Sequence, residues 1–210
     1  MTLQFRPATP DDDDAAVPLI YSSGPAAFDY VFAVPGKADS QAFLRRAFVD
    51  GRGEFGFRNH VVGVADGRIV AAGAGWDGTA TASFTLAASR QIIGCYGIGA
   101  GTGVMLRGLR VEAIVQPPGR RCWYVAHLGV SPDLRSRGIG EALVAQLLET
   151  GRARGHTLAA LDVAVTNPRA EALYARLGFH TTRELTSSLA NAQATVPSHR
   201  RMELPLGSPA

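Results

Sequence analysis

The sequence predicts an α/β (α+β) fold in which helices cover a central sheet, and three observations support it. Apolar runs at 122–130 and 159–165 flank an amphipathic segment at 141–154, which indicates a strand, a helix and a second strand. A hairpin is predicted at 60–65 and 68–75, because an Asp-Gly pair separates two runs typical of strands. The 210 residues are 46% hydrophobic and 19% charged, a composition typical of a globular chain with a substantial core.

The N-terminal part is predicted to contain a short strand followed by helices. Residues 3–6 are the strand candidate, and Thr9-Pro10 with acids at 11–14 predicts the start of a helix. These acids fit a helix N-terminus better than a metal cluster. Pro18 is expected to kink or end this helix, and another helix is predicted at 41–50.

The stretch at about 77–119 is predicted to be an irregular insertion within a single domain spanning 1–210. A helix is one interpretation of 79–93. The glycines at 97–103 are similar to a dinucleotide-binding loop, but no strand leads into them and no acid follows at the required spacing. Close helix packing or a turn-rich connection is the preferred interpretation, and a nucleotide-dependent enzyme is the weakest alternative.

The segment 130–140, Val-Ser-Pro-Asp-Leu-Arg-Ser-Arg-Gly-Ile-Gly, has the composition of an anion-binding turn. It joins a predicted strand to a predicted helix, where backbone N–H groups are free and the helix dipole is positive. Gly138 and Gly140 allow a ligand to approach the backbone, and Arg135 and Arg137 supply positive charge. We therefore predict a site for a phosphate-bearing ligand at this turn.

A second pattern lies at 167–179, after the strand predicted at 159–165. Asn167 and the proline that follows it are typical of a helix start, and Gly178 is typical of the residue after a helix. Asn167 and Tyr174 are about two turns apart, so they face the same side of this helix. An amide and a phenol then line the cleft between the two predicted strands.

Together, the two patterns resemble the motifs of the GNAT superfamily of N-acetyltransferases. The first is similar to the family's Arg-x-x-Gly-x-Gly motif and the second to its Asn followed by Tyr-x-x-Leu-Gly-Phe, and the close resemblance covers about 122–182. It implies a GNAT-like mixed central sheet flanked by helices and splayed between the strands at 122–130 and 159–165. It also implies acetyl-CoA as the co-substrate, with its pyrophosphate bound by Arg135, Ser136, Arg137, Gly138, Ile139 and Gly140.

The resemblance also implies roles for residues near the thioester. The pantetheine is expected along Leu128-Gly129-Val130, with an N–H of Gly129 or Val130 directed at the thioester oxygen. Asn167 and Tyr174 are expected at the cofactor, and Tyr174 is expected to protonate the leaving sulfur. The alternative for Tyr174 is an aromatic ring packed on the helix face.

The base that would deprotonate the amine is the least determined part of the site. Residues 122–130 contain no carboxylate, and His127 is the one imidazole there. Imidazole titrates near neutral pH, which makes His127 a candidate catalytic base. The alternatives are a structural core histidine, or a water chain to Asp162, Glu54 or an acid elsewhere. Aromatic residues in 21–32 either line the acceptor pocket or belong to the core.

The expected function is transfer of an acetyl group from acetyl-CoA to a primary amine of a small molecule, by direct attack in a ternary complex. A protein N-terminus or a lysine is the alternative acceptor. A non-catalytic module that binds or senses acyl-CoA is the alternative class of protein.

Charge and cysteine content argue against several other classes. A net charge of +3 without a basic stripe argues against a nucleic-acid partner, and scattered histidines argue against a metal site. Cys95 and Cys122 do not make a disulfide framework, and no run of apolar residues reaches the length of a membrane span. We therefore expect a cytoplasmic protein without a membrane partner. The resemblance also implies that a homodimer can form.

Overall fold

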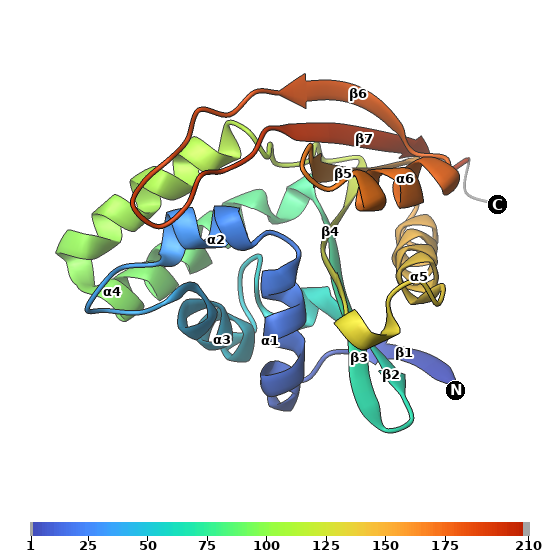
Figure 1. Ribbon diagram of the computed structural model, residues 1–210, viewed down its shortest axis with the longest axis horizontal. Helices are drawn as coiled ribbons and strands as arrows, with labels where there is room; N and C mark the ends of the chain where they lie inside the picture. The colour runs from blue at the N-terminus through green and yellow to red at the C-terminus, as the bar shows by residue number, and fades with distance from the viewer. Residues whose placement is uncertain (1, 208–210) are drawn as a thin grey trace.

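A seven-stranded sheet runs through the molecule in the order β1-β2-β3-β4-β5-β7-β6 (Figure 1). The structure is a computed structural model and describes residues 2–207. Neighbouring strands pair antiparallel, except β4 and β5, which pair parallel. The predicted mixed sheet is therefore confirmed. The strands are β1 (Leu3–Pro7), β2 (His60–Ala65), β3 (Arg68–Asp77), β4 (Cys122–Val130), β5 (Leu158–Ala164), β6 (His180–Leu185) and β7 (His199–Pro205).

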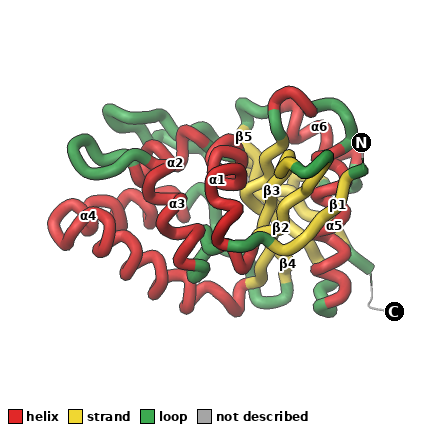
Figure 2. The backbone as a smooth tube through the Cα atoms, turned by 90° about the horizontal axis from the view of Figure 1, so that it is seen from below, coloured by secondary structure: helices red, strands yellow, loops and turns green. Residues whose placement is uncertain are grey.

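Helices cover both faces of the sheet (Figure 2). Helix α1 packs on β3 and β4 from one face, together with α2, α3 and α4, while α5 packs on the same two strands from the opposite face. Helix α6 lies on the α5 side. The helices are α1 (Asp13–Ser22), α2 (Pro25–Phe32), α3 (Ser40–Asp50), α4 (Thr81–Glu112), α5 (Ile139–Ala153) and α6 (Pro168–Arg176).

The strand–helix–strand succession and the hairpin form at the positions predicted from the sequence. The predicted strand–helix–strand succession is β4, α5 and β5. The predicted hairpin is β2 and β3, and its turn residues Asp66 and Gly67 have φ of 49° and 75°. Positive φ at both positions gives the turn a twist that matches the flanking strands.

Of the two effects expected of Pro18, a kink or an end of the first helix, the end does not occur. It lies inside α1, which continues to Ser22. The missing N–H of Pro18 deprives only the carbonyl of Asp14 of its helical partner, and Asp14 is exposed to water that can replace the bond.

The strands β4 and β5 separate soon after they begin. They pair only at Cys122 with Leu158, Trp123 with Ala159 and Tyr124 with Ala160. The expected splay is therefore present. Beyond this point one edge of β4 has no paired strand among the described residues, so its backbone groups are open to a ligand that lies alongside it.

The stretch predicted as an irregular insertion is mostly helical, which corrects that expectation. Helix α4 covers Thr81–Glu112 and is broken at Gly97, where φ is 75° and ψ is 171°. Its two arms fold back on each other, and an added Cβ on Gly101 would lie 3.4 Å from Cγ2 of Ile92 on the other arm (Figure 1). The glycine run therefore serves a turn and close helix packing, as preferred over a nucleotide loop.

By length and composition alone, the segment Gly78–Glu112 passes as a candidate membrane span. The break at Gly97 divides it into arms of 81–96 and 98–112, each shorter than the roughly 20 residues that a span needs. Several large apolar side chains on these arms are exposed, namely Leu86, Ile93, Ile98, Leu106 and Leu109.

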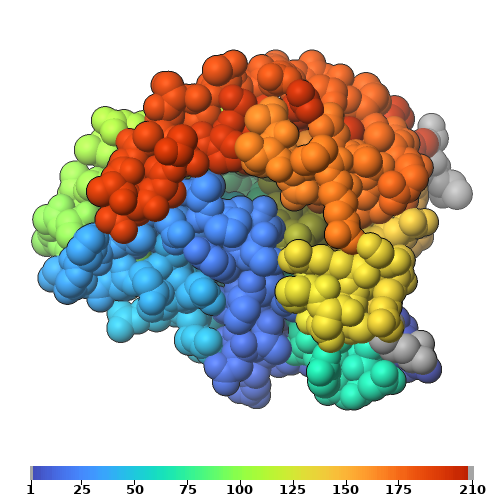
Figure 3. All heavy atoms as spheres, viewed as in Figure 1, coloured from blue at the N-terminus to red at the C-terminus, as the bar shows by residue number. Residues whose placement is uncertain are grey.

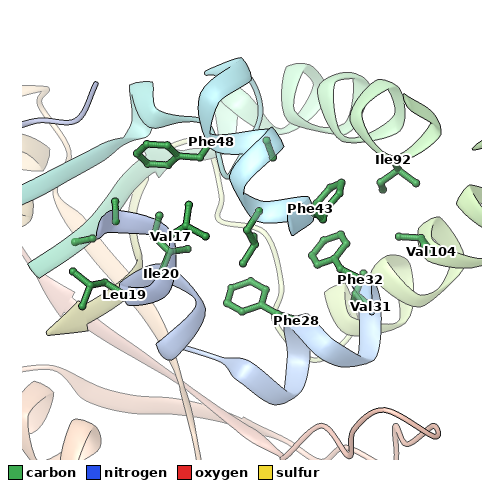
Figure 4. Packing of buried hydrophobic residues seen from close by; sticks show 14 of the residues in the cluster. Val17, Leu19, Ile20, Phe28, Val31, Phe32, Phe43, Phe48, Ile92 and Val104 are labelled. Atoms are coloured by element: carbon green, nitrogen blue, oxygen red, sulfur yellow. The ribbon is translucent and has the colours of Figure 1, made fainter. Parts of the chain in front are cut away.

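The core on the α1 side of the sheet is rich in aromatic rings. In Figure 4, Phe28 and Phe32 from α2 point toward Phe43 from α3, while Ile92 and Val104 close the cluster from the two arms of α4. The rings of Phe32 and Phe43 stack with centroids 4.2 Å apart. The core on the α5 side is mainly aliphatic. The two faces of β4 therefore have different chemistry.

Candidate active site

The turn after β4 presents free backbone amides at the start of α5. Ser136 and Gly138 have φ of 64° and 80°, and Gly138 is the residue that precedes α5. Left-handed residues next to helical ones turn successive N–H groups to one side, which is the geometry of anion-binding loops. Helix α5 contains 15 residues, so its dipole adds to the attraction for a phosphate.

Three arginines gather at this turn, one more than the sequence analysis predicted. Arg135 and Arg137 are exposed on the turn itself. Arg169, from the first turn of α6, donates through Nη2 to Oγ of Ser136 at 2.5 Å. Its place two residues after Asn167 was visible in the sequence, but its direction toward the turn depends on how α6 docks beside α5.

Helix α6 begins as predicted, with Asn167 as its cap. Oδ1 of Asn167 accepts from the backbone N–H of Ala170 at 3.2 Å. Gly178 follows the helix with φ of 93°, which favours glycine. The cofactor contact expected of Asn167 stays a prediction.

Tyr174 lies buried on the α5 side, where its ring is 6.2 Å from that of Phe179. Burial raises the pKa of Tyr174 to about 12, so the phenol keeps its proton at neutral pH. Within residues 2–207 no hydrogen bond of its hydroxyl is recorded, and an added ligand can accept from it. The protonated phenol suits a general acid, and the contact with Phe179 suits a packed aromatic ring.

A bulge in β4 places His127 on the α1 side of the sheet. Ala72 of β3 pairs with Gly129 while Ala74 pairs with Ala126, so two residues of β4 oppose one residue of β3. His127 has φ of 57°, and this left-handed residue turns its side chain away from the face that simple alternation gives. The alternation of side chains along a regular strand therefore does not predict the face to which His127 points.

Gly129 is required by a close approach of α1 to β4. An added Cβ there would lie 2.1 Å from the carbonyl oxygen of Leu19. The glycine fits the expected close backbone contact, but the contact is with α1. Leu128 and Val130 pack on the α5 side. The thioester role expected of this segment stays a prediction.

His127 forms a hydrogen-bonded series with groups far away in the sequence. Its Nδ1 lies 3.1 Å from Nε2 of His60 on β2, and Nδ1 of His60 lies 2.9 Å from the carbonyl oxygen of Gly56. On its other side, Nε2 of His127 lies 3.4 Å from Oε1 of Glu54. The side chain of His127 is 7% exposed, and that of Glu54 is 44% exposed.

Aromatic rings enclose this series. The centroids of Phe55, Trp76 and Phe28 lie 5.1, 5.5 and 6.2 Å from that of His127. Phe28 belongs to the stretch that was predicted as pocket wall or core, and it also packs in the core of α1, α2 and α3. The sequence analysis identified Glu54 only as one of several acids, and it missed His60, because neither lies near β4 in the chain.

Asp162 is engaged elsewhere and does not reach His127 directly. Its Oδ2 accepts from the hydroxyl of Tyr124 at 2.6 Å, and Arg201 pairs with it at 2.9 Å. Burial raises the pKa of Asp162, although Arg201 and Tyr124 oppose that effect. Of the two acids named in the sequence analysis, Glu54 is the one that contacts the histidine.

The two cysteines lie on different elements, Cys95 in α4 and Cys122 at the start of β4. Burial raises the pKa of Cys122 to about 11, which suppresses the reactive thiolate. Both cysteines are free. In the described part of the chain, no group of three or more His, Cys, Asp or Glu side chains is placed to hold a metal ion.

The turn, β4 and α6 meet on one face of the molecule. Figure 3 shows a hollow there, between the blue N-terminal helices, the yellow region that follows β4 and the orange region of α6. The unpaired edge of β4 runs from the arginine-bearing turn toward the His127 bulge. One extended ligand lying along this edge can therefore reach both regions.

Comparison with known proteins agrees with this arrangement. Residues 38–179 match the model of the acetyltransferase (GNAT) family. An uncharacterized N-acetyltransferase of Methanocaldococcus jannaschii is 46% identical over 50 residues. That match spans 24% of this chain and 22% of the relative, about a fifth of its length.

Solved structures show the same fold at low sequence identity. An N-acetyltransferase from Staphylococcus aureus gives a TM-score of 0.66 at 15% identity, over 96% of this chain and 100% of that one. A phosphinothricin acetyltransferase from Sinorhizobium meliloti, solved in complex with AcCoA, gives 0.60 at 18% identity, over 99% and 90%. The ribosomal-protein-S18-alanine N-acetyltransferase from Escherichia coli gives 0.55 at 16% identity, over 100% and 97%. With a family match over more than half of its length and this sheet, the chain belongs to the acetyltransferase (GNAT) family.

Proposed function

We propose that this protein transfers an acetyl group from acetyl-CoA to a primary amine of a small molecule, by direct attack in a ternary complex. The proposal rests on one observation: β4 connects an arginine-bearing anion site at its C-terminal end with a hydrogen-bonded histidine at its bulge. The first suits a diphosphate, and the second suits a proton acceptor beside a reacting amine.

The donor is bound along β4 in this proposal. Amides of the turn at 136–140 and the guanidinium groups of Arg135, Arg137 and Arg169 meet the phosphate oxygens of coenzyme A. The pantetheine then lies against Leu128, Gly129 and Val130, and an N–H of Gly129 or Val130 polarises the thioester carbonyl. The AcCoA complex of the Sinorhizobium meliloti neighbour supports this choice of donor.

The transfer itself forms a C–N bond and breaks a C–S bond. The lone pair of the amine attacks the thioester carbon, and the nitrogen gives up a proton to Nε2 of His127. The sulfur leaves as the tetrahedral intermediate collapses, and the hydroxyl of Tyr174 protonates it. Because the thiol of Cys122 is buried and protonated, no acetyl-cysteine step is included.

A small acceptor is favoured by the enclosure of His127. Aromatic rings surround the imidazole, which a slim amine can approach more readily than a folded protein surface can. Structural neighbours include both classes: the Drosophila melanogaster polyamine N acetyltransferase, with a TM-score of 0.58 and 22% identity over 97% of this chain and all of that one, and the Escherichia coli enzyme that acts on a ribosomal protein. The fold therefore does not choose between them, and the enclosure of His127 by aromatic rings supports the small-molecule class.

The test is a thiol-release assay with acetyl-CoA and a panel of alkylamines, arylalkylamines, diamines, amino acids and short peptides. We expect saturable release of coenzyme A with small primary amines. Binding of acetyl-CoA without release across the whole panel would instead support the non-catalytic module. Release with peptides alone would move the acceptor to the protein class.

The donor site is tested by calorimetry with coenzyme A. Replacing Arg135 and Arg137 together by Ala should weaken binding by about tenfold or more, since each removes a charge-assisted hydrogen bond. The matched control replaces Arg90 and Arg110, which are exposed on α4. An unchanged Kd in the first variant would remove the turn from the proposal.

A further inference from the structure

Two histidine rings from different strands lie stacked beside the proposed acceptor. The ring centroids of His60, on β2, and His127, on β4, are 5.3 Å apart, with 12° between the ring planes. We infer that His60 is a positioning residue: it holds the proton of neutral His127 on Nδ1 and so leaves Nε2 as the atom that accepts a proton from the amine. The inference rests on the proposed acetyl transfer.

The carbonyl oxygen of Gly56 determines where the protons lie. It is 2.9 Å from Nδ1 of His60, and a carbonyl only accepts, so Nδ1 of His60 carries a proton and donates it. Nε2 of neutral His60 then offers only a lone pair. Its 3.1 Å contact with Nδ1 of His127 therefore requires an N–H on that nitrogen. The remaining nitrogen of His127, Nε2, is the basic one.

Burial keeps His60 in the neutral form that this arrangement needs. Desolvation, followed by the neighbouring His127, lowers the pKa of His60 to about 3. Within the described residues, the charged or titratable groups recorded against the two rings are the rings themselves and Glu54. The other rings against them are uncharged: Phe28, Phe48, Phe55 and Trp76. His60 therefore remains an acceptor while His127 gains and loses a proton.

Glu54 lies where the transferred proton arrives. Its Oε1 is 3.4 Å from Nε2 of His127, and its side chain is 44% exposed. When the amine gives up its proton to Nε2, the imidazolium formed donates to His60 through Nδ1 and faces the Glu54 carboxylate through Nε2. Before that step, Nε2 and the carboxylate are both acceptors, so an incoming amine beside them has two groups to which it can donate an N–H.

One short loop supplies both ends of the series. Residues 54–56 provide the carboxylate, a ring stacked on His127 and the carbonyl that orients His60. The loop is held by Nδ2 of Asn59, which donates to the carbonyl of Gly53 at 2.6 Å. An added Cβ on Gly56 would lie 2.4 Å from the carbonyl carbon of Gly51, so glycine is required for this path.

Nitrogen-15 NMR of the ring nitrogens tests the proton placement without any substrate. At about pH 8, where imidazole is neutral, we expect Nδ1 of His127 to carry the proton and Nε2 to be unprotonated. In the His60→Phe variant the partner nitrogen is lost, and His127 should populate both tautomers. In His60→Gln the amide oxygen can still accept from Nδ1 and the amide N–H₂ can still donate to Gly56, so the Nδ1–H form should return.

Kinetics of the same variants test the consequence for transfer. His60→Phe should lower kcat by about tenfold or more with little change in KM for acetyl-CoA, because the wrong tautomer presents no lone pair to the amine. The pH at which kcat falls on the acidic side of the pH–rate profile should also change in His60→Phe. His60→Gln should recover most of kcat. Circular dichroism and thermal midpoints verify that both variants are folded.

Two results would overturn the inference. One is a neutral His127 in the unmodified protein with its proton on Nε2. The other is a folded His60→Phe variant with an unchanged kcat and pH–rate profile. If the protein transfers no acetyl group to any amine, the proposed function fails, while the NMR measurement still decides whether His60 sets the tautomer.

Discussion

The two faces of β4 are assembled from different parts of the chain. Toward α5, Trp123, Val125 and Leu128 pack against residues that lie mostly between 122 and 182. Toward α1, His127 meets groups from α2, from the loop at 54–56, from β2 and from β3. The first face is built locally around a strand, a turn and a helix, and the second is built by long-range contacts.

In the proposed function, this difference separates binding of the acetyl donor from binding of the acceptor. The local face ends in the arginine-bearing turn, whose amides and charges need only α5 and α6 to be in place. The long-range face holds the titratable groups, which need the whole sheet and the bulge. Variants of the arginine-bearing turn should therefore act on cofactor binding, and variants of the second face on turnover, pH dependence or stability.

The largest expected effect is on turnover, from His127→Gln. Removing a general base lowers kcat by about 10²–10⁴-fold, while KM for acetyl-CoA should stay nearly constant, since the cofactor turn is unchanged. Steady-state kinetics across pH measure it, and the acid limb of the profile should disappear. His180→Gln, an exposed histidine at the start of β6, is the matched control. Turnover within twofold of the unmodified protein would assign the proton to another acceptor.

Gly129→Ala should affect stability more than any chemical step. Its Cβ would lie 2.1 Å from the Leu19 carbonyl oxygen, so α1 must move away from β4. We expect a loss of about 1–3 kcal/mol in the free energy of unfolding, measured by urea denaturation. Gly119→Ala, where an added Cβ meets open space, is the control and should be close to neutral. Equal midpoints for the two variants would show that α1 and β4 adjust freely.

Tyr174→Phe should lower kcat by about tenfold while leaving the Kd of acetyl-CoA unchanged. The phenol is kept protonated by burial, which raises its pKa to about 12, so it can supply a proton to the leaving thiolate. Single-turnover kinetics and calorimetry measure the two quantities. Tyr30→Phe, in the buried part of α2, is the control for loss of a buried hydroxyl. If both variants turn over equally fast, Tyr174 is a packing residue.

Between neutral and mildly acidic pH, the smallest expected effect is a dependence of stability on pH that comes from His60. Burial lowers its pKa from 6.5 to about 3, so below pH 6.5 the unfolded chain binds a proton that the folded chain does not. Its contribution to stability is therefore complete above pH 6.5 and is lost as the pH falls toward 3. The slope is at most about 1.4 kcal/mol per pH unit. The urea midpoint should fall less between neutral and mildly acidic pH in His60→Gln than in the unmodified protein. An equal fall in the two proteins would contradict this assignment.

Features that depend on adjacent residues were predicted from the sequence, and features that depend on packing were not. The hairpin turn at Asp66-Gly67, the cap at Asn167 and the left-handed Gly178 were predicted, because each depends on a few adjacent residues. The sequence left open whether Pro18 kinks or ends its helix, and α1 continues past it to Ser22, with the carbonyl that loses its partner exposed to water. Helix α4 was largely missed, since its glycines suggest a loop while packing between its arms favours a helix.

The sequence by itself determined the family motifs, the order of most elements and the arginine-bearing turn before α5, because hydrophobic period, capping and turn chemistry act over a few residues. It also named His127 as a candidate base, without placing its side chain. Only the tertiary structure decided that a bulge turns His127 toward the α1 face, that His60 forms a hydrogen bond with it and with Gly56, and that Glu54 lies against its other ring nitrogen. Those partners come from distant segments, and their meeting depends on strand register and on the close contact of α1 with Gly129, which no local pattern encodes.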